Sequence, residues 1–296
     1  MEEKIHFYSD CLKIVGTFRA PDSRKEGERL PCIIGIHGGS GTSTANALKI
    51  IGGELSEAGY CFLTFHHRGF GESEGIRGRS IWQNRFRDIE DAITYAQQRP
   101  EVDPERIGLI GLSIGGAYAV YTAGVDERVK CAVEVGGMGD GERRFRLRMP
   151  YYEFLELQDQ IKEDRIRRVL TGESKRRAYR GNEYLGPEHE ELRKKSKDKE
   201  TYNKEGYPLE NTDNLMSFRP ESVVHQISPR AILFVNAERD AIVPVDEARS
   251  MYAKAGEPKK LMVIPGSGHG EVYPANNPEV FASIMQESLD WYARHL

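Results

Sequence analysis

The chain has 296 residues, with 42 Lys and Arg against 46 Asp and Glu, so its formal net charge is −4. This balance offers no basic excess to attract nucleic acid or anionic lipid, and no apolar run approaches the ~20 residues that cross a bilayer. The first residues, MEEKIHFYSD, contain no apolar segment of the signal-peptide kind. We therefore expect a cytoplasmic protein without a nucleic-acid or membrane partner.

The predicted elements alternate between apolar runs and helical segments. Residues 4–21 favour two short strands with a tight turn between them, and a charged loop follows at 22–29. Near-continuous apolar runs, typical of strands buried on both faces, then begin at residues 30, 59, 106, 129, 230 and 259. Helical spacing appears at 45–58, 81–99, 114–124, 244–255 and 278–295. This order predicts an α/β fold with a mostly parallel central sheet and helices on both faces.

One long segment breaks the alternation. Residues 139–222 contain no buried strand, are highly charged, and form too long a stretch for a plain loop. We interpret them as a mainly helical cap inserted into a core of residues 1–138 and 223–296. Its interleaved aromatic residues are expected to line a substrate pocket; they are Phe145, Tyr151, Tyr152, Phe154, Tyr179, Tyr184, Tyr202 and Tyr207.

The four cysteines predict no metal site and no disulfide framework. Cys32, Cys61 and Cys131 fall in or beside predicted strands, and none of the four, Cys11 included, belongs to a CxxC pair or a histidine cluster. Buried reduced thiols that pack as small hydrophobes fit this pattern.

The sequence around Ser113 has the form G-x-S-x-G. An apolar strand leads into Gly111-Leu112-Ser113-Ile114-Gly115, and a helix of small residues follows. A sharp strand-to-helix turn needs glycines two residues on either side of the serine, and it leaves the hydroxyl exposed at the edge of the sheet. The context therefore predicts a nucleophile, although a tight turn with an incidental serine has the same short pattern.

A serine nucleophile needs a base, and the base needs an acid that orients it. After such a turn the expected chain order is Ser, Asp or Glu, then His. Asp240 follows one late strand, and His269 follows the next in a glycine-rich loop, so both come to the same sheet edge as Ser113. Glu238 and Asp246 are the rival acids near Asp240, but neither is as well placed relative to the strand end.

Two backbone N–H groups are expected to stabilise the oxyanion of the reaction. One belongs to Ile114, which directly follows the nucleophile and begins a helix. The other should come from the loop His37-Gly38-Gly39-Ser40-Gly41, with Gly39 as the choice and Ser40 as the near alternative. This loop lacks the Gly-Lys-Ser/Thr ending of a phosphate-binding P-loop.

A second loop, His66-His67-Arg68-Gly69, also follows a predicted strand. We expect Arg68 to orient loops near the site rather than to take part in chemistry. Adjacent residues on a strand point to opposite faces, so His66 and His67 cannot share one metal ion without distortion.

Five motifs together resemble the α/β-hydrolase superfamily over nearly the whole chain. They are HGGSG at 37–41, RGFGES at 68–73, GLSIGG at 111–116, ERDAIVP at 238–244 and GSGHG at 266–270. The R-G-x-G-x-S turn is similar to the branch with dienelactone-hydrolase-like and acyl-peptidase-like esterases. The resemblance implies a nucleophile at Ser113, an acid at Asp240, a base at His269, an oxyanion hole with Gly39 and Ile114, and no cofactor.

The function we expect is hydrolysis of a carboxylic ester of a small molecule through an acyl-enzyme. Serine replaces the cysteine of true dienelactone hydrolases, which argues against that activity. The same triad also supports hydrolysis of amides, peptides or carbon–carbon bonds, and a ligand-binding protein on a hydrolase scaffold is a third reading. The superfamily is compatible with a homodimer, but no interface is visible in the sequence.

Overall fold

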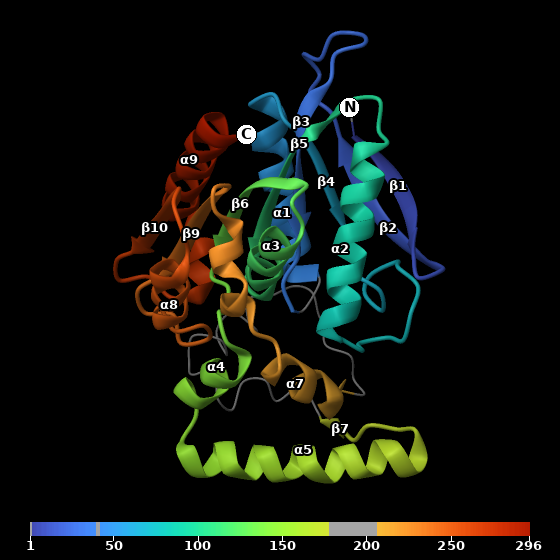
Figure 1. Ribbon diagram of the computed structural model, residues 1–296, viewed down its shortest axis with the longest axis vertical. Coiled ribbons are helices and arrows are strands. Elements are labelled where there is room, and N and C mark those ends of the chain that lie inside the picture. The colour runs from blue at the N-terminus through green and yellow to red at the C-terminus, as the bar shows by residue number, and fades with distance from the viewer. Residues whose placement is uncertain (1, 40–41, 178–205) are drawn as a thin grey trace.

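The computed structural model of the protein describes residues 2–39, 42–177 and 206–296. Within them, eight strands form one sheet in the order β1-β2-β4-β3-β5-β6-β9-β10 (Figure 1). The strands are β1 Glu2–Ser9, β2 Leu12–Arg19, β3 Leu30–Ile36, β4 Cys61–Phe65, β5 Val102–Leu112, β6 Val129–Val135, β9 Ala231–Ala237 and β10 Lys259–Ile264. All neighbours from β4 to β10 pair in parallel, so the predicted α/β class with a mostly parallel sheet is confirmed.

The antiparallel edge of the sheet begins with a hairpin. β1 and β2 pair from Glu2 with Arg19 to Ser9 with Leu12, and β2 pairs antiparallel with β4. The two turn residues, Asp10 and Cys11, have φ values of 45° and 65°. Two successive positive φ angles are typical of the type I′ turn, whose twist matches the twist of the flanking strands.

Helices cover both faces of the sheet and bury a separate apolar cluster on each. α1 (Thr42–Glu57) and α9 (Pro278–His295) pack on one face. α2 (Trp82–Gln97), α3 (Ile114–Val125) and α8 (Asp246–Lys254) pack on the other. With apolar residues buried on both sides, the parallel strands hold their carboxyl ends in fixed positions at one edge of the sheet.

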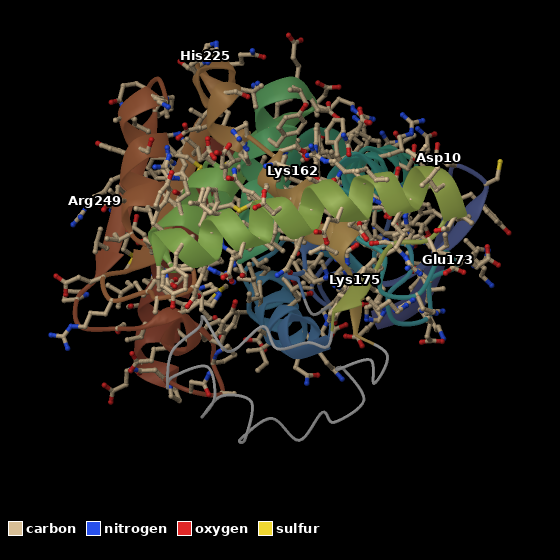
Figure 2. The ribbon with its side chains drawn as sticks, turned by 90° about the horizontal axis from the view of Figure 1, so that it is seen from below. Asp10, Lys162, Glu173, Lys175, His225 and Arg249 are labelled. Carbon is tan, nitrogen blue, oxygen red and sulfur yellow. The ribbon has the colours of Figure 1, made fainter. Side chains whose placement is uncertain are left out.

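Among the described residues, three α-helices lie beyond that edge of the sheet, in the segment between β6 and β9. Figure 1 shows α4 (Gly141–Leu147) and α7 (Leu209–Met216) below the sheet and α5 (Tyr151–Thr171) lying across beneath both. Seen from below, α5 spans the front of the molecule with Lys162 near its middle (Figure 2). The three helices share a small core of their own, made of Phe145, Met149, Phe154, Leu157, Ile161 and Leu209.

Buried ionic contacts hold α4 against α8. Glu247 of α8 is fully buried and accepts hydrogen bonds at 2.9 Å from the backbone N–H groups of Gly139 and Asp140. The Arg143 guanidinium donates to Glu247 at 2.6 Å and also pairs with Glu221. A buried carboxylate is stable only when its oxygens are paired in this way, so the contact fixes where α4 leaves the core.

A second set of polar contacts attaches α7 to the segment before α2. Arg79 donates two hydrogen bonds to Glu210, at 2.7 and 2.8 Å. The Asn211 side chain accepts from the backbone N–H of Ser80 at 2.8 Å, and Asn214 accepts from Trp82 at 2.5 Å. α4 and α7 are therefore tied to the core at two separate places, α4 to α8 and α7 to the segment before α2.

The expectation that the aromatic residues of 139–222 line a pocket is wrong for four of them. Phe145 and Phe154 are buried within the core that α4, α5 and α7 share. Tyr151 and Tyr152 are 65% and 63% exposed. Tyr207, in the short strand β8 (Tyr207–Pro208), is partly buried. Tyr179, Tyr184 and Tyr202 lie outside the described residues.

Membrane-spanning segments are not found among the helices of the described residues, because none combines enough length with enough apolar character. Cys32, Cys61 and Cys131 are buried, as predicted from their place in the apolar runs, whereas Cys11 is exposed in the hairpin turn.

Candidate active site

Ser113 occupies a strained turn between β5 and α3. Its φ of 55° and ψ of −127° are rarely adopted by residues other than glycine. The turn closes because two glycines let backbone segments touch. A Cβ at Gly111 would come 2.1 Å from the Gly115 carbonyl oxygen, and a Cβ at Gly115 would come 2.2 Å from the Ile36 carbonyl oxygen. Neither position can hold a larger residue without moving the serine.

The side chains of Ser113, His269 and Asp240 form one hydrogen-bonded chain. Ser113 Oγ lies 3.1 Å from His269 Nε2, and His269 Nδ1 lies 2.5 Å from Asp240 Oδ2. With the imidazole neutral, Nδ1 donates to the carboxylate, which leaves Nε2 free to accept the serine proton. His269 and Asp240 are buried and Ser113 is partly exposed. The series of hydrogen bonds therefore runs from the protein interior to an accessible hydroxyl.

Of the three acidic residues considered as the partner of His269, the loop after β9 orients Asp240 toward it. Asp240 Oδ1 accepts hydrogen bonds from the N–H groups of Ile242 and Val243, at 2.8 and 2.7 Å, which turns Oδ2 toward His269. Glu238 instead accepts from the Gly266 N–H at 2.8 Å, and Asp246 pairs with Arg249 at 3.0 Å. Neither rival has a hydrogen bond to His269 among the described residues.

The two residues predicted for the oxyanion hole lie near each other. Ile114 is the first residue of α3, so its N–H belongs to a helix N-terminus, where negative charge is favoured. Gly39 is close enough that a Cβ there would sit 3.8 Å from Ile114 Cγ2. Ser40, the near alternative to Gly39, lies outside the described residues.

Buried His37 joins the loop after β3 to the loop after β4. The His67 backbone N–H donates to His37 Nε2 at 3.1 Å, so the ring proton sits on Nδ1, which donates to the Gly38 carbonyl at 2.7 Å. Burial lowers the pKa of His37 well below its usual value, and the imidazole therefore stays neutral. A neutral ring can form both hydrogen bonds at once, and it holds the backbone beside Gly39.

Arg68 holds the loop after β4 in place through contacts with three other side chains. Its guanidinium donates to Asp88 at 2.8 Å, to Asp10 at 2.9 Å and to the Ser9 hydroxyl at 2.8 Å. Asp88 also lies 3.4 Å from Nδ1 of His67, a histidine whose pKa burial lowers to about 4. Within the part of the chain that the structure describes, no cluster of three or more His, Cys, Asp or Glu could hold a metal ion.

Glu134 is a buried carboxyl group that the sequence reasoning missed. It interrupts an otherwise apolar run in β6, is fully buried, and accepts a hydrogen bond from the Gly137 N–H. Burial raises the pKa of Glu134 to about 8 despite that hydrogen bond, and the charge of Asp240 adds to the rise. At neutral pH Glu134 is therefore mostly protonated.

Tyr273 is a second residue that the sequence reasoning missed. Its ring meets the ring of His269 edge-on, with 6.0 Å between centroids. Burial and the Asp240 carboxylate raise the pKa of Tyr273 well above its usual value, while a hydrogen bond with the Ser113 side chain opposes that rise. The hydroxyl is thus a neutral group next to the serine. The one available signal was its place in the loop that carries His269.

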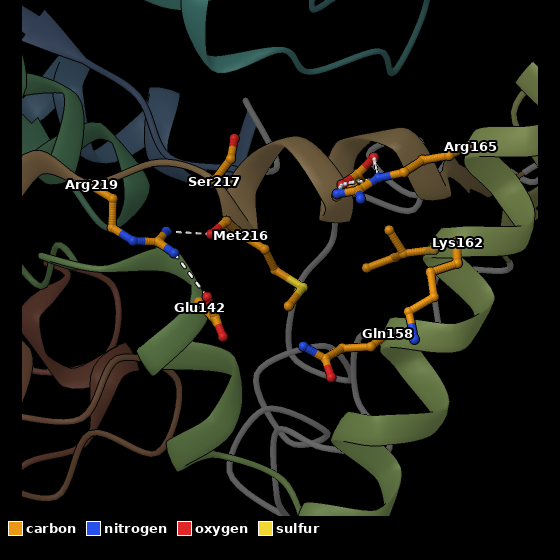
Figure 3. A pocket seen from close by; sticks show the side chains of 9 residues that line it. Glu142, Gln158, Lys162, Arg165, Met216, Ser217 and Arg219 are labelled. Atoms are coloured by element: carbon orange, nitrogen blue, oxygen red, sulfur yellow. Dashed lines mark hydrogen bonds and ion pairs between the residues drawn. The ribbon is translucent and has the colours of Figure 1, made fainter. Parts of the chain in front are cut away.

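A separate hollow of about 300 Å³ lies between α4, α5 and α7. Figure 3 shows Lys162 and Gln158 reaching toward it from α5. Other charged groups of its lining are paired with one another, as Arg165 is with Asp213 and Arg219 with Glu142. Its lining contains no histidine, whereas Ser113 lies beside His269.

Comparison with known protein families gives a broad match. A family model described as "alpha/beta hydrolase fold" matches residues 31–271, a range that includes Ser113, Asp240 and His269. An uncharacterized 31.7 kDa protein of Escherichia coli, from the traX-finO intergenic region, is 28% identical over 295 residues and covers 95% of each chain. The polyketide transferase grgF of a Penicillium species is 27% identical over 254 residues, which is 82% of this chain and 81% of the transferase.

Solved structures share the fold at low sequence identity. The alpha/beta hydrolase GrgF from Penicillium sp. sh18 superposes with a TM-score of 0.80 at 23% identity, over 100% of this chain and 99% of that one. Est1E from Butyrivibrio proteoclasticus, solved with ferulic acid bound, gives a TM-score of 0.68 at 18% identity, over 98% and 99%. These likenesses confirm the fold class.

Substitution at Gly115 tests the steric origin of the turn. Gly115→Ala places a Cβ against the Ile36 backbone, so we expect a loss of at least about 2 kcal/mol in the free energy of unfolding, measured by urea denaturation. Gly53→Ala is the matched control. Its Cβ would meet only the end of the Arg19 side chain, and alanine favours the helix, so its stability should equal or exceed that of the wild type. Equal stability of both variants would contradict the steric account.

The raised pKa of Glu134 predicts a specific dependence of stability on pH. The pKa of Glu134 in the folded protein, about 8, lies above the ordinary value of 4.5. Its contribution to the free energy of unfolding is therefore fully present below pH 4.5 and is lost as pH rises through about 8. Glu134→Gln retains an acceptor for Gly137 but does not ionise. Relative to the wild type, this variant should gain on the order of a few kcal/mol in unfolding free energy between pH 5 and pH 9. If the difference in unfolding free energy between the variant and the wild type is the same at pH 5 and pH 9, Glu134 does not ionise in the buried state.

Proposed function

The chain belongs to the alpha/beta hydrolase family, and on that premise we propose that it is a serine hydrolase. Its substrate is a carboxylic ester of a small apolar or aromatic molecule, and the reaction proceeds through an acyl-enzyme on Ser113. The hydrogen bonds from Ser113 Oγ through His269 to Asp240 carry the proposal, because they supply an accessible nucleophile, a histidine base and a buried acid in the required order.

In this mechanism His269 moves the proton and Ser113 forms the bond. Nε2 accepts the hydroxyl proton while Oγ attacks the ester carbonyl, and Asp240 stabilises the imidazolium that results. The protonated His269 then returns that proton to the leaving alcohol as the C–O bond breaks. A water molecule, activated by the same imidazole, attacks the acyl-enzyme and releases the acid together with free Ser113.

The oxyanion of each tetrahedral intermediate would accept hydrogen bonds from the N–H groups of Ile114 and Gly39. Donors fixed in the backbone need no reorganisation during the reaction, and removal of one such donor typically slows catalysis by about 10²–10³-fold. The position of Ile114 at the N-terminus of α3 and the proximity of Gly39 support this assignment. The hydrogen bonds of His37 keep the Gly39 loop in its place.

Residues 139–222 would act as a cap over this site. The segment leaves the core four residues after β6 ends, directly beside the carboxyl edge that carries Ser113 and His269. The contacts of Glu247 with α4 and of Arg79 with α7 support a fixed attachment on two sides. A cap of this kind restricts the substrate to a small molecule and shields the site from bulk solvent.

The same residues could resolve the acyl-enzyme with a nucleophile other than water. The Penicillium relative is named a polyketide transferase, which favours acyl transfer to an acceptor as a second candidate. Amide or carbon–carbon bond hydrolysis would use the triad in the same way. These reactions differ in the bond that is cleaved and in what attacks the acyl-enzyme, so matched substrates and acceptors can separate them.

Matched substrates test the reaction class. An aryl ester and the corresponding anilide, with the same acyl group, should differ by orders of magnitude in kcat/KM, with the ester favoured. A burst of phenol equal to the enzyme concentration would report the acyl-enzyme. Faster turnover of the anilide would contradict the ester assignment, and a rate that rises with added alcohol while acid production falls would favour the transferase.

A pair of neighbouring carboxylates tests the assignment of the acid. Asp240→Asn keeps the acceptor for Ile242 and Val243 but loses the carboxylate that holds His269, so kcat should fall by roughly 10⁴-fold. Glu238→Gln, two residues earlier, keeps an acceptor for Gly266 and should leave kcat within about threefold of the wild type, since glutamate at 238 does not contact His269. A larger loss in the Glu238 variant would reverse the assignment.

A further inference from the structure

The exposed apolar surface of this protein is concentrated on α5. The described residues include eleven large apolar side chains that are exposed, and seven of them fall between residues 147 and 170. They are Leu147, Tyr151, Tyr152, Leu155, Ile166, Val169 and Leu170. Val169 and Leu170 are 85% and 77% exposed, and such a concentration marks an interaction site more often than it occurs by chance.

α5 is apolar on two opposite sides. Its inner side packs Phe154, Leu157 and Ile161 into the core shared with α4 and α7. At the helical repeat of 3.6 residues per turn, the exposed apolar positions fall within one arc roughly 100° wide on the other side. We call this arc the outer face; its members are Tyr151, Tyr152, Leu155, Ile166, Val169 and Leu170.

The outer face points away from α4 and α7, against which the inner side of α5 packs. α5 lies farther from the sheet than α4 and α7 (Figure 1), and it crosses the front when the molecule is seen from below (Figure 2). A second molecule could therefore lie along α5 without meeting the sheet or its covering helices.

We propose that the outer face binds the outer face of a second copy, with the two α5 helices antiparallel. The apolar positions are spaced symmetrically about the point between Gln160 and Ile161. An antiparallel pair centred there brings Leu155 level with Ile166 of the second copy. The same pairing brings Tyr151 and Tyr152 level with Leu170 and Val169 at both ends, so that every apolar position meets another.

A charged pair in the middle of α5, whose lysine also lines the hollow, fits the same pairing. Asp159 and Lys162 form an exposed ion pair at 2.8 Å in the middle of α5. Their positions are symmetric about the same point, so each comes level with the opposite charge of the second copy. The two carboxylates and two ammonium groups sum to zero, whereas an acidic or basic partner would leave one pair of charges uncompensated.

The same residues argue against a lipid surface as the occupant. Helices that lie on anionic membranes carry Lys and Arg beside their apolar face. Here the exposed charges beside the outer face are mixed: Glu156 and Glu163 lie on α5 together with Arg165 and Arg167, so no basic stripe accompanies the apolar positions. One helix pair also covers less than the ~800 Å² per partner of a standard interface, so the dimer should be weak and dependent on concentration.

Sedimentation velocity of the full chain, from about 1 µM to about 1 mM, tests the proposal over the range of weak interfaces. The wild type should shift from monomer to dimer as concentration rises. Ile166→Glu should raise the dissociation constant at least about tenfold, because it introduces a charge at two symmetric apolar contacts. Ile76→Glu is the matched control, as Ile76 is 64% exposed and Ile166 is 62% exposed, but it lies outside α5; it should dimerise like the wild type.

A charge exchange distinguishes a second copy from any other occupant. Asp159→Lys gathers four positive charges at the centre of the pair and should abolish the dimer. Adding Lys162→Asp restores the sum to zero and should restore the dimer. Circular dichroism and ester turnover establish that each variant is folded, since neither residue contacts Ser113, Asp240 or His269.

Three outcomes would overturn the proposal. The first is a wild type that stays monomeric throughout the range. The second is a dimer that Ile166→Glu leaves intact, because a different surface would then form it. The third is a monomeric protein that binds anionic vesicles through the outer face, because the occupant would then be a lipid surface.

Discussion

The backbone of Ser113 is the constraint on which the rest of the structure depends. A φ of 55° at a residue other than glycine is costly, and it persists because the surrounding chain leaves no alternative. Gly115 rests against the carbonyl of Ile36, so the turn is locked between β5 and β3. Both neighbours are central strands buried on both faces, and the energy of that burial is what holds the serine in place.

The other parts of the site follow from the parallel sheet. β9 and β10 end at the same edge as β5, so the loops that carry Asp240 and His269 reach Ser113 without long excursions. Buried polar groups then fix those loops: Asp240 binds its own backbone neighbours, and His37 links two loops through opposite ring nitrogens. Each hydrogen bond is modest alone, but breaking any of them leaves a buried group unsatisfied.

Much of this arrangement could be predicted from the sequence, because apolar runs, glycines and chain order carry it. The alternation of runs predicted the sheet, and the motif at 111–115 with the loops at 240 and 269 predicted which side chains meet. Glu134 and Tyr273 could not be predicted, since their roles come from burial and from contacts between distant segments. The sequence also could not predict that Tyr151 is exposed and Phe154 is buried, because two apolar sides of one helix have the same pattern until its packing is known.

Intact-mass analysis after treatment with a small fluorophosphonate tests the central claim most directly, because the reagent reacts with an activated serine whatever the natural substrate is. The wild type should gain one adduct, while Ser113→Ala should gain none. Asp240→Asn should react much more slowly, and Glu238→Gln should react like the wild type. An adduct that persists in Ser113→Ala, or a wild type that never reacts although an ester enters the site, would contradict the account.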